Sequence, residues 1–84
     1  MRYIVIYDIP DDRIRMKIAD ICLDYGLDRV QYSAFLGRLT RGQQREMVKK
    51  IRRRLGKHEG KVLILPVSAD AWRERVEIVQ EAEE

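Results

Sequence analysis

Cysteine, proline and glycine are scarce in this chain of 84 residues, which contains one Cys, two Pro and five Gly. Because Cys22 is the only cysteine, no disulfide can close within the chain and no cysteine-based metal cluster can form. The longest apolar runs span four to five residues, far fewer than the roughly 20 that a membrane helix requires. We therefore expect a small globular domain in a reducing, cytoplasmic compartment, with no membrane as a partner.

Charge is unevenly distributed along the chain, although the net charge is only +3. Residues 43–65 hold eight Lys or Arg against two Asp or Glu, whereas residues 66–84 hold two against six. A strongly basic segment indicates a surface that binds a polyanion. The acidic end, residues 80–84, is expected to be a solvated tail.

The spacing of apolar residues predicts an alternation of strands and helices. Thr40 followed three residues later by Gln43 is typical of a capping box, which marks the start of a helix. Gly26 and Gly56 are placed where a glycine can end a helix. The predicted elements are, in order, a strand at 3–7, a helix at 12–25, two short paired strands within 28–39 (or one strand kinked around residues 31–33), a helix between Thr40 and Gly56, a strand at 61–67, a helical turn at 70–74 and an edge strand at 75–79.

This order, β-α-β-β-α-β with one extra strand at the C-terminal end, predicts a ferredoxin-like α+β sandwich. Both faces of the first strand are apolar, with Tyr3 and Val5 on one side and Ile4 and Ile6 on the other. Two helices cover only one face of a sheet, so an identical chain related by a two-fold axis is the simplest cover for the second. We expect one domain over residues 1–79 and a homodimer.

Asp8 ends the first strand on the face of Ile4 and Ile6. A carboxylate beside hydrophobic side chains needs a capping role, an ion-pair partner or a metal. A two-fold axis would bring two copies of Asp8 together, and Mg²⁺ is bound in proteins by one or two carboxylates with water. Two interpretations of Asp8 therefore stay open, a structural cap and a Mg²⁺ ligand shared by two chains.

Basic residues that could contact phosphate occur in three places. Arg13, Arg15 and Lys17 lie on the first helix, where a solvated face is an equally good interpretation, and Arg29 begins the second extended segment. A solvent-exposed helix face normally mixes charges of both signs. The second helix instead carries a run of like charges, which we interpret as a surface for the phosphates of a duplex. That run consists of Lys49, Lys50, Arg52, Arg53 and Arg54.

Two stretches of the sequence resemble the signature segments of the second CRISPR-associated protein family, the small metal-dependent endonucleases of CRISPR adaptation. They are residues 7–13, YDIPDDR, and residues 26–35, GLDRVQYSAF. The resemblance implies a ferredoxin-like homodimer in which residues 75–79 add a strand to the partner's sheet and Asp8 from both chains binds Mg²⁺. It further implies a set of residues that support nuclease activity, namely Tyr7, Asp8, Arg15, Lys17, Arg29, Ser33 and Phe35.

The resemblance leaves alternative functions open. One is a Mg²⁺-dependent endoribonuclease, with DNA as a second substrate to consider. Another is a non-catalytic dimer that bridges two dimers of the CRISPR integrase, the first CRISPR-associated protein, and binds duplex spacer DNA. A more remote alternative is a ribonuclease toxin of similar fold. In the nuclease interpretation, Arg15, Lys17 and Arg29 would position the phosphate.

Overall fold

The computed structural model describes residues 1–82 of the chain, and of the expected acidic tail only Glu83 and Glu84 lie outside the described residues. The order of elements confirms the predicted β-α-β-β-α-β pattern, followed by a short third helix. The elements are β1 (Arg2–Asp8), α1 (Asp12–Asp24), β2 (Asp28–Gln31), β3 (Ala34–Arg38), α2 (Arg41–Leu55), β4 (Lys61–Val67) and α3 (Ala69–Arg73).

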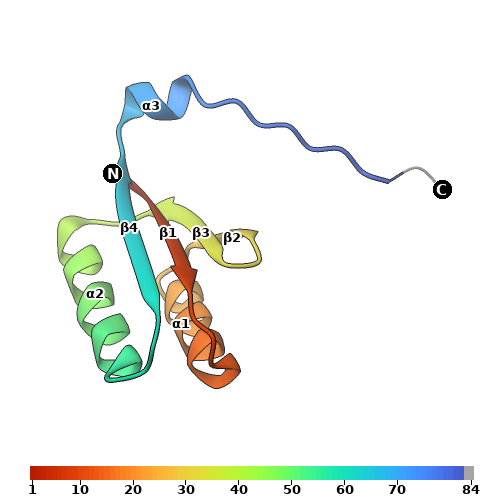
Figure 1. Ribbon diagram of the computed structural model, residues 1–84. Helices are drawn as coiled ribbons and strands as arrows, with labels where there is room; N and C mark the ends of the chain where they lie inside the picture. Colours follow the sequence, from red (N-terminus) through yellow and green to blue (C-terminus); the bar gives the residue numbers. More distant parts are fainter. Residues whose placement is uncertain (83–84) are drawn as a thin grey trace.

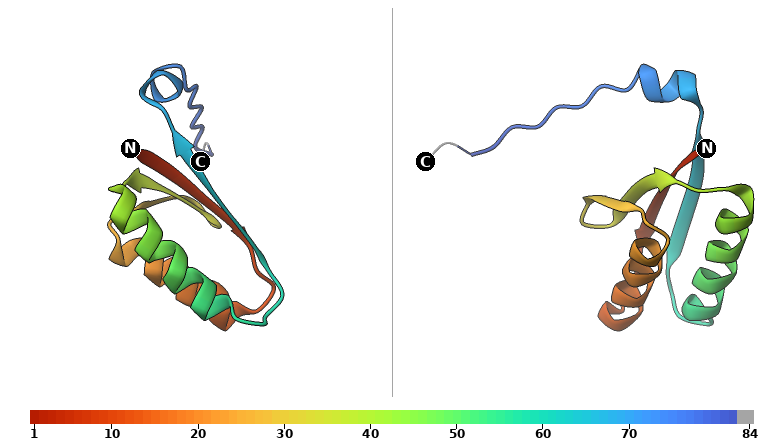
Figure 2. Two further views of the ribbon diagram at one scale, coloured as in Figure 1. Left: turned by 90° about the vertical axis from the view of Figure 1, so that its left-hand side faces the viewer. Right: turned by 180° about the vertical axis from the view of Figure 1, so that it is seen from behind.

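The four strands form one antiparallel sheet in the order β2-β3-β1-β4, as expected for a ferredoxin-like sandwich. The central strand β1 pairs with β3 on one side and with β4 on the other. Both long helices lie on the same face of the sheet (Figures 1 and 2). Asp8 therefore stands at the end of a central strand rather than at a free edge.

Local sequence signals explain where the helices begin and end. The Asp11 carboxylate accepts a hydrogen bond of 3.0 Å from the backbone N–H of Ile14 and caps α1. The predicted capping box at α2 is confirmed, because Thr40 and Gln43 each accept a hydrogen bond from the other's backbone N–H. Gly26 follows the end of α1 with φ of +80°, a conformation that a residue with a Cβ rarely adopts.

The hydrophobic core lies between the sheet and the two long helices. Its largest fully buried side chains are Val5, Ile18, Cys22, Phe35 and Met47. These residues come from β1, α1, β3 and α2, so every one of these elements is tied to the same core. The core holds the first turn of α1 and the end of β1 close together, which positions the residues described below.

The opposite face of the sheet, here called the open face, is apolar and uncovered in the single chain. Ile6, Leu63 and Leu65 retain 43%, 51% and 44% of their accessible surface. The register places Ile6 opposite Leu63, and Ile4 opposite both Leu36 and Leu65, so the side chains form one continuous patch. Apolar side chains therefore do occur on both faces of the sheet, as the sequence predicts, and only one face is covered by helices.

The chain after α3 carries no helix or strand within its described part, residues 75–82. It extends away from the domain (Figures 1 and 2), and Val76, Ile78 and Val79 are at least 80% exposed. Residues 75–79, expected to form a strand, therefore pair with no strand of the described chain. Their addition to a partner's sheet stays a prediction. Trp72 anchors the start of this segment, since its ring lies 4.3 Å from the Arg2 guanidinium and 3.7 Å from that of Arg75. No helix among residues 1–82 is long and apolar enough to cross a membrane.

Candidate functional site

Asp8 lies on the open face at the last position of β1. Its carboxylate is exposed, and Lys61 is its partner across the ladder to β4. Asp8 also lines a small depression of about 150 Å³ together with Glu59, a carboxylate that sequence reasoning did not select. Residues 1–82 contain no group of three or more His, Cys, Asp or Glu side chains arranged to hold a metal ion. One described chain therefore offers carboxylate oxygens of the kind that suits Mg²⁺, but too few to form a closed site.

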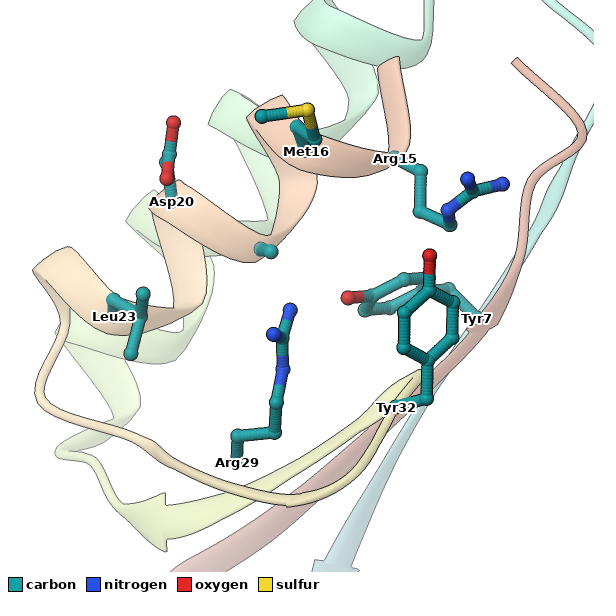
Figure 3. Close-up of a pocket in the computed structure, with 8 residues that line it drawn as sticks. Tyr7, Arg15, Met16, Asp20, Leu23, Arg29 and Tyr32 are labelled. Atoms are coloured by element: carbon teal, nitrogen blue, oxygen red, sulfur yellow. The ribbon is translucent and has the colours of Figure 1, made fainter. Parts of the chain in front are cut away.

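A second candidate site lies on the helix-covered side of the same strand. Tyr7, Arg15, Arg29 and Tyr32 line a hollow of about 280 Å³, which we call the tyrosine pocket (Figure 3). Its outer wall is formed by side chains of α1, namely Met16, Ala19, Asp20 and Leu23. The pocket thus gathers residues from β1, α1, β2 and the turn that joins β2 to β3.

Polar contacts hold Arg15, one of the two arginines of the tyrosine pocket. Arg15 donates a hydrogen bond of 2.9 Å to the backbone carbonyl of Ile9 and forms an ion pair with Asp12. Its guanidinium carbon lies 5.6 Å from the ring centre of Tyr32. This combination fixes the Arg15 side chain at the junction between β1 and α1.

Arg29 is held by aromatic rings. Its guanidinium carbon lies 5.0 Å from the ring centre of Phe35 and 6.0 Å from that of Tyr32. The salt bridges of the described chain include none to Arg29. Stacking on the aromatic rings leaves the planar guanidinium edge of Arg29 able to donate hydrogen bonds to a ligand.

Tyr7 contributes a buried hydroxyl to the pocket. Only 3% of its surface is exposed, and its ring stacks on Phe35 with centres 6.3 Å apart. The hydroxyl has no hydrogen-bond partner among the described residues and points toward Arg29 (Figure 3). Burial raises the pKa of Tyr7, while hydrogen bonding from the adjacent Arg29 guanidinium and its positive charge oppose part of that rise. The hydroxyl therefore keeps its proton at neutral pH and is a hydrogen-bond donor.

The structure brings together some of the residues that the sequence resemblance selected. Tyr7, Arg15, Arg29 and Phe35 cluster at the tyrosine pocket, and the backbone carbonyl of Ser33 accepts a 3.1 Å hydrogen bond from the Tyr7 N–H. Asp8 lies on the other face of the sheet.

Arg13 and Lys17 do not share this cluster. Each lies two positions from Arg15 on α1, and a helix turns by about 100° per residue, so both project away from the pocket into solvent. Tyr32 lines the pocket but was not selected from the sequence. Its position between two extended segments was visible there, but only the fold shows that its ring lies near Arg15 and Arg29.

The basic run of α2 is exposed at all five positions and spreads around the helix. Lys50, Arg53 and Arg54 line a groove of about 710 Å³ between α1 and α2, together with Asp24 and His58. Arg52 instead lies on the side of α2 that faces β4, beside Val62 and Ile64. The helix thus presents a broad cationic surface, on all sides except the one that packs on the core.

The fold and these sites define a class of protein: a small ferredoxin-like domain with a strand-terminal aspartate and surfaces suited to an anionic polymer. Comparison with known proteins makes the assignment specific. Residues 1–75 match the family model described as CRISPR associated protein Cas2. The chain is 48% identical over 75 residues to a CRISPR-associated endoribonuclease Cas2 of Chloroflexus aurantiacus, covering 89% of this chain and 88% of that protein.

Two further comparisons extend this result. A CRISPR-associated endonuclease Cas1/endonuclease Cas2 fusion of Thermoproteus tenax is 43% identical over 53 residues, which are 63% of this chain and 20% of the fusion. The crystal structure of Streptococcus pyogenes Cas2 superposes with a TM-score of 0.80 at 22% identity, covering 95% of this chain and all of that one. The chain belongs to the Cas2 family of CRISPR-associated proteins. The family resemblance noted in the sequence and the ferredoxin-like fold are both confirmed.

Proposed function

We propose that this Cas2 family member acts in CRISPR adaptation as a Mg²⁺-dependent endoribonuclease that works as a homodimer. The observation that carries the proposal is the exposed Asp8 carboxylate, which lies on the same face as the uncovered apolar patch of the sheet. The relatives named as endoribonucleases support the nuclease class.

The open face supports the homodimer. An isolated patch of Ile and Leu side chains on a sheet is typical of a surface that another protein covers. A second copy placed on this face by a two-fold axis would cover the patch of each chain with that of the other. The same axis would set the two Asp8 carboxylates on one side of the interface, so that oxygen ligands from both chains could hold one Mg²⁺. Residues 75–79 would then add as a strand to the partner's sheet.

In this proposal Mg²⁺ would supply Lewis-acid activation of water and neutralise charge on the phosphodiester. Asp8 would hold the ion, and Lys61 opposite Asp8 would balance the negative charge of the bound phosphodiester. Arg13 and Lys17, exposed on α1, would attract the nucleic acid by their charge. Ser33 would keep the end of β1 in place through its backbone contact with Tyr7.

Replacing Asp8 tests the nuclease proposal. Asp8→Asn keeps the size of the side chain but removes the anionic ligand, so Mg²⁺-dependent cleavage of RNA should fall by at least about 100-fold while the dimer persists. Asp28→Asn, at an exposed carboxylate on β2, is the matched control and should cleave like the wild type. Gel assays on RNA and DNA of the same sequence, with Mg²⁺ or with EDTA, give the rates. Equal cleavage by the Asp8→Asn and Asp28→Asn proteins would rule out Asp8 as the metal ligand.

A second candidate function, a scaffold that binds duplex DNA and joins the Cas1 integrase, is supported by the exposed basic run of α2. The Cas1/Cas2 fusion among the relatives supports association with Cas1. Each phosphate contact contributes roughly one unit to the slope of log affinity against log salt. Reversing Arg52, Arg53 and Arg54 to Glu should therefore lower duplex affinity at least tenfold and flatten that slope, as measured by fluorescence anisotropy between 50 and 200 mM salt. An unchanged slope would remove α2 from the DNA interface.

A further inference from the structure

The tyrosine pocket contains more hydrogen-bond donors than its own residues satisfy. The buried Tyr7 hydroxyl lacks an acceptor within the described part of the chain, and a buried polar group without a partner is uncommon in folded proteins. Arg29 lies beside it with its guanidinium held on Phe35 and with no carboxylate partner in the described salt bridges. The Tyr7 hydroxyl can accept a hydrogen bond from Arg29, but its own O–H and the other guanidinium N–H groups are donors that still lack acceptors. The chemical species that completes the site is therefore an acceptor and an anion.

We propose that the tyrosine pocket binds the terminal phosphate of a nucleotide, with the Arg29 guanidinium and the Tyr7 hydroxyl as its donors. The proposal rests on the proposed function in one respect, namely that the ligand is a nucleic acid or a component of one. A phosphate monoester carries close to two negative charges at neutral pH and three acceptor oxygens. It can therefore accept from the planar edge of Arg29 and from Tyr7 at once, while Arg15 adds positive charge from the opposite side.

The dimensions and the walls of the pocket fit one nucleotide rather than a continuous strand. A hollow of about 280 Å³ lies just below the range of roughly 300–1,000 Å³ for pockets that enclose drug-sized ligands. Tyr32 stands at its mouth with 69% of its surface exposed and offers a flat face on which a base can stack. Met16 and Leu23, both largely exposed, give an apolar wall along the same opening.

Two carboxylates near the pocket oppose anion binding but do not prevent it. Asp12 pairs with Arg15 and is 83% exposed, so water screens its charge. Asp20 lies at the outer wall and points away from the two tyrosines (Figure 3). The donors converge inside the pocket while the carboxylates face solvent. Removal of the Asp20 charge should strengthen anion binding, whereas substitutions at Arg29 and Tyr7 should weaken it. The two kinds of variant therefore test the proposal in opposite directions.

This site is spatially separate from the proposed metal ligand. Tyr7 points to the helix-covered side of β1 and Asp8 to the open face. A phosphate in the tyrosine pocket therefore does not lie at the Asp8 carboxylate of the same chain. The pocket would hold the end of a strand, or a released nucleotide, on the face of β1 opposite to the one where Asp8 is proposed to act.

Binding can be measured without cleavage in the Asp8→Asn protein with EDTA present. The probe is a tetranucleotide with a 3′ fluorescent label, prepared with either a 5′ phosphate or a 5′ hydroxyl, and the readout is anisotropy. The 5′-phosphorylated form should bind about tenfold tighter than the hydroxyl form. Adding Arg29→Gln or Tyr7→Phe should remove most of that preference, and adding Asp20→Asn should increase the affinity for the phosphorylated form about twofold to threefold. Arg41→Gln, which removes an equal charge from the start of α2, should leave the preference unchanged.

Competition distinguishes the sources of the phosphate. The two competitors are adenosine monophosphate and an unlabelled phosphorylated tetranucleotide. If both displace the probe at equal concentrations, a free nucleotide is sufficient for binding. If the tetranucleotide competes far better, the site binds the end of a strand. Three outcomes would overturn the proposal. The two labelled probes could bind equally, or Arg29→Gln and Arg41→Gln could have equal effects. Inorganic phosphate could also displace the probe at the same concentration as adenosine monophosphate does. Because EDTA is present throughout, loss of the Mg²⁺-dependent activity and loss of this preference are separate results.

Discussion

The side chains of Tyr7 and Asp8 follow each other in the chain but lie on opposite faces of β1, Tyr7 buried beneath α1 and Asp8 exposed on the open face. Successive side chains of a strand alternate between faces, so this division is a direct consequence of the β conformation. It separates a buried pocket from a candidate metal ligand by a single residue. The two sites can therefore be changed independently by mutation.

Replacing Tyr7 by Phe should stabilise the protein. The buried Tyr7 hydroxyl has no partner within the described chain, and a buried unsatisfied polar group costs about 1–3 kcal/mol. Tyr7→Phe keeps the ring that stacks on Phe35, so we expect the free energy of unfolding to rise by about 1 kcal/mol in urea denaturation. A loss of stability would show that the hydroxyl has a partner in solution. The same variant is expected to lose phosphate preference, so stability and binding should change in opposite directions.

An acidic substitution on the open face should prevent self-association. Leu63 is 51% exposed in the single chain, so Leu63→Glu is compatible with the folded monomer but places a charge in the proposed interface. We expect the wild type to sediment as a dimer at micromolar concentration and the variant as a monomer. Leu23→Glu is the control, since Leu23 is 53% exposed on the helix side. A wild type that sediments as a monomer would contradict the homodimer.

Two glycines should respond to alanine in opposite ways. A Cβ at Gly37 would lie 2.6 Å from Cδ2 and 3.1 Å from Cα of Leu27, which is buried, so Gly37→Ala should cost about 1–3 kcal/mol of stability. A Cβ at Gly42, near the start of α2, would meet nothing closer than 3.9 Å, and Gly42→Ala should raise stability by up to about 1 kcal/mol. Thermal and urea unfolding of the two variants checks both signs. Equal stabilities would indicate that Leu27 moves aside.

Alkaline pH should weaken the fold through Cys22. Burial raises the pKa of the Cys22 thiol from 9.0 to about 11, so the unfolded chain loses this proton at lower pH than the folded chain does. The contribution of the buried, protonated Cys22 thiol to stability is therefore complete below pH 9 and is lost as the pH rises toward 11. The difference in stability between the wild type and Cys22→Ala should shrink between pH 8 and pH 10.5. Because the two proteins share all other titrating groups, taking this difference cancels the contributions of those groups. A difference that is independent of pH would show that the thiol is not desolvated.

Local signals in the sequence were sufficient for the elements of this fold. The capping box of Thr40 and Gln43 and the glycine after α1 act within a few residues, so their effects can be derived without knowing the rest of the molecule. The predicted strand at 61–67 coincides with β4. The strand expected at 75–79 stays a prediction, because a strand requires a hydrogen-bonding neighbour and the described part of this single chain provides none there.

For the candidate sites, the sequence predicted residue types more readily than their grouping. Asp8 was placed correctly on the face of Ile4 and Ile6 by the two-residue period of a strand. The period of α1 separates Lys17 from Arg15, although the two are close in the sequence. Tyr32 became a candidate only when the turn between β2 and β3 was seen to face α1.

The amino-acid sequence by itself determined the order of helices and strands, the caps that end them and the family to which the chain belongs, because these depend on neighbouring residues and short motifs. Only the tertiary structure decided that Arg15 and Arg29 line one pocket with Tyr7. Residues far apart along the chain come together through strand register and packing on a shared core, and neither is encoded in any local stretch.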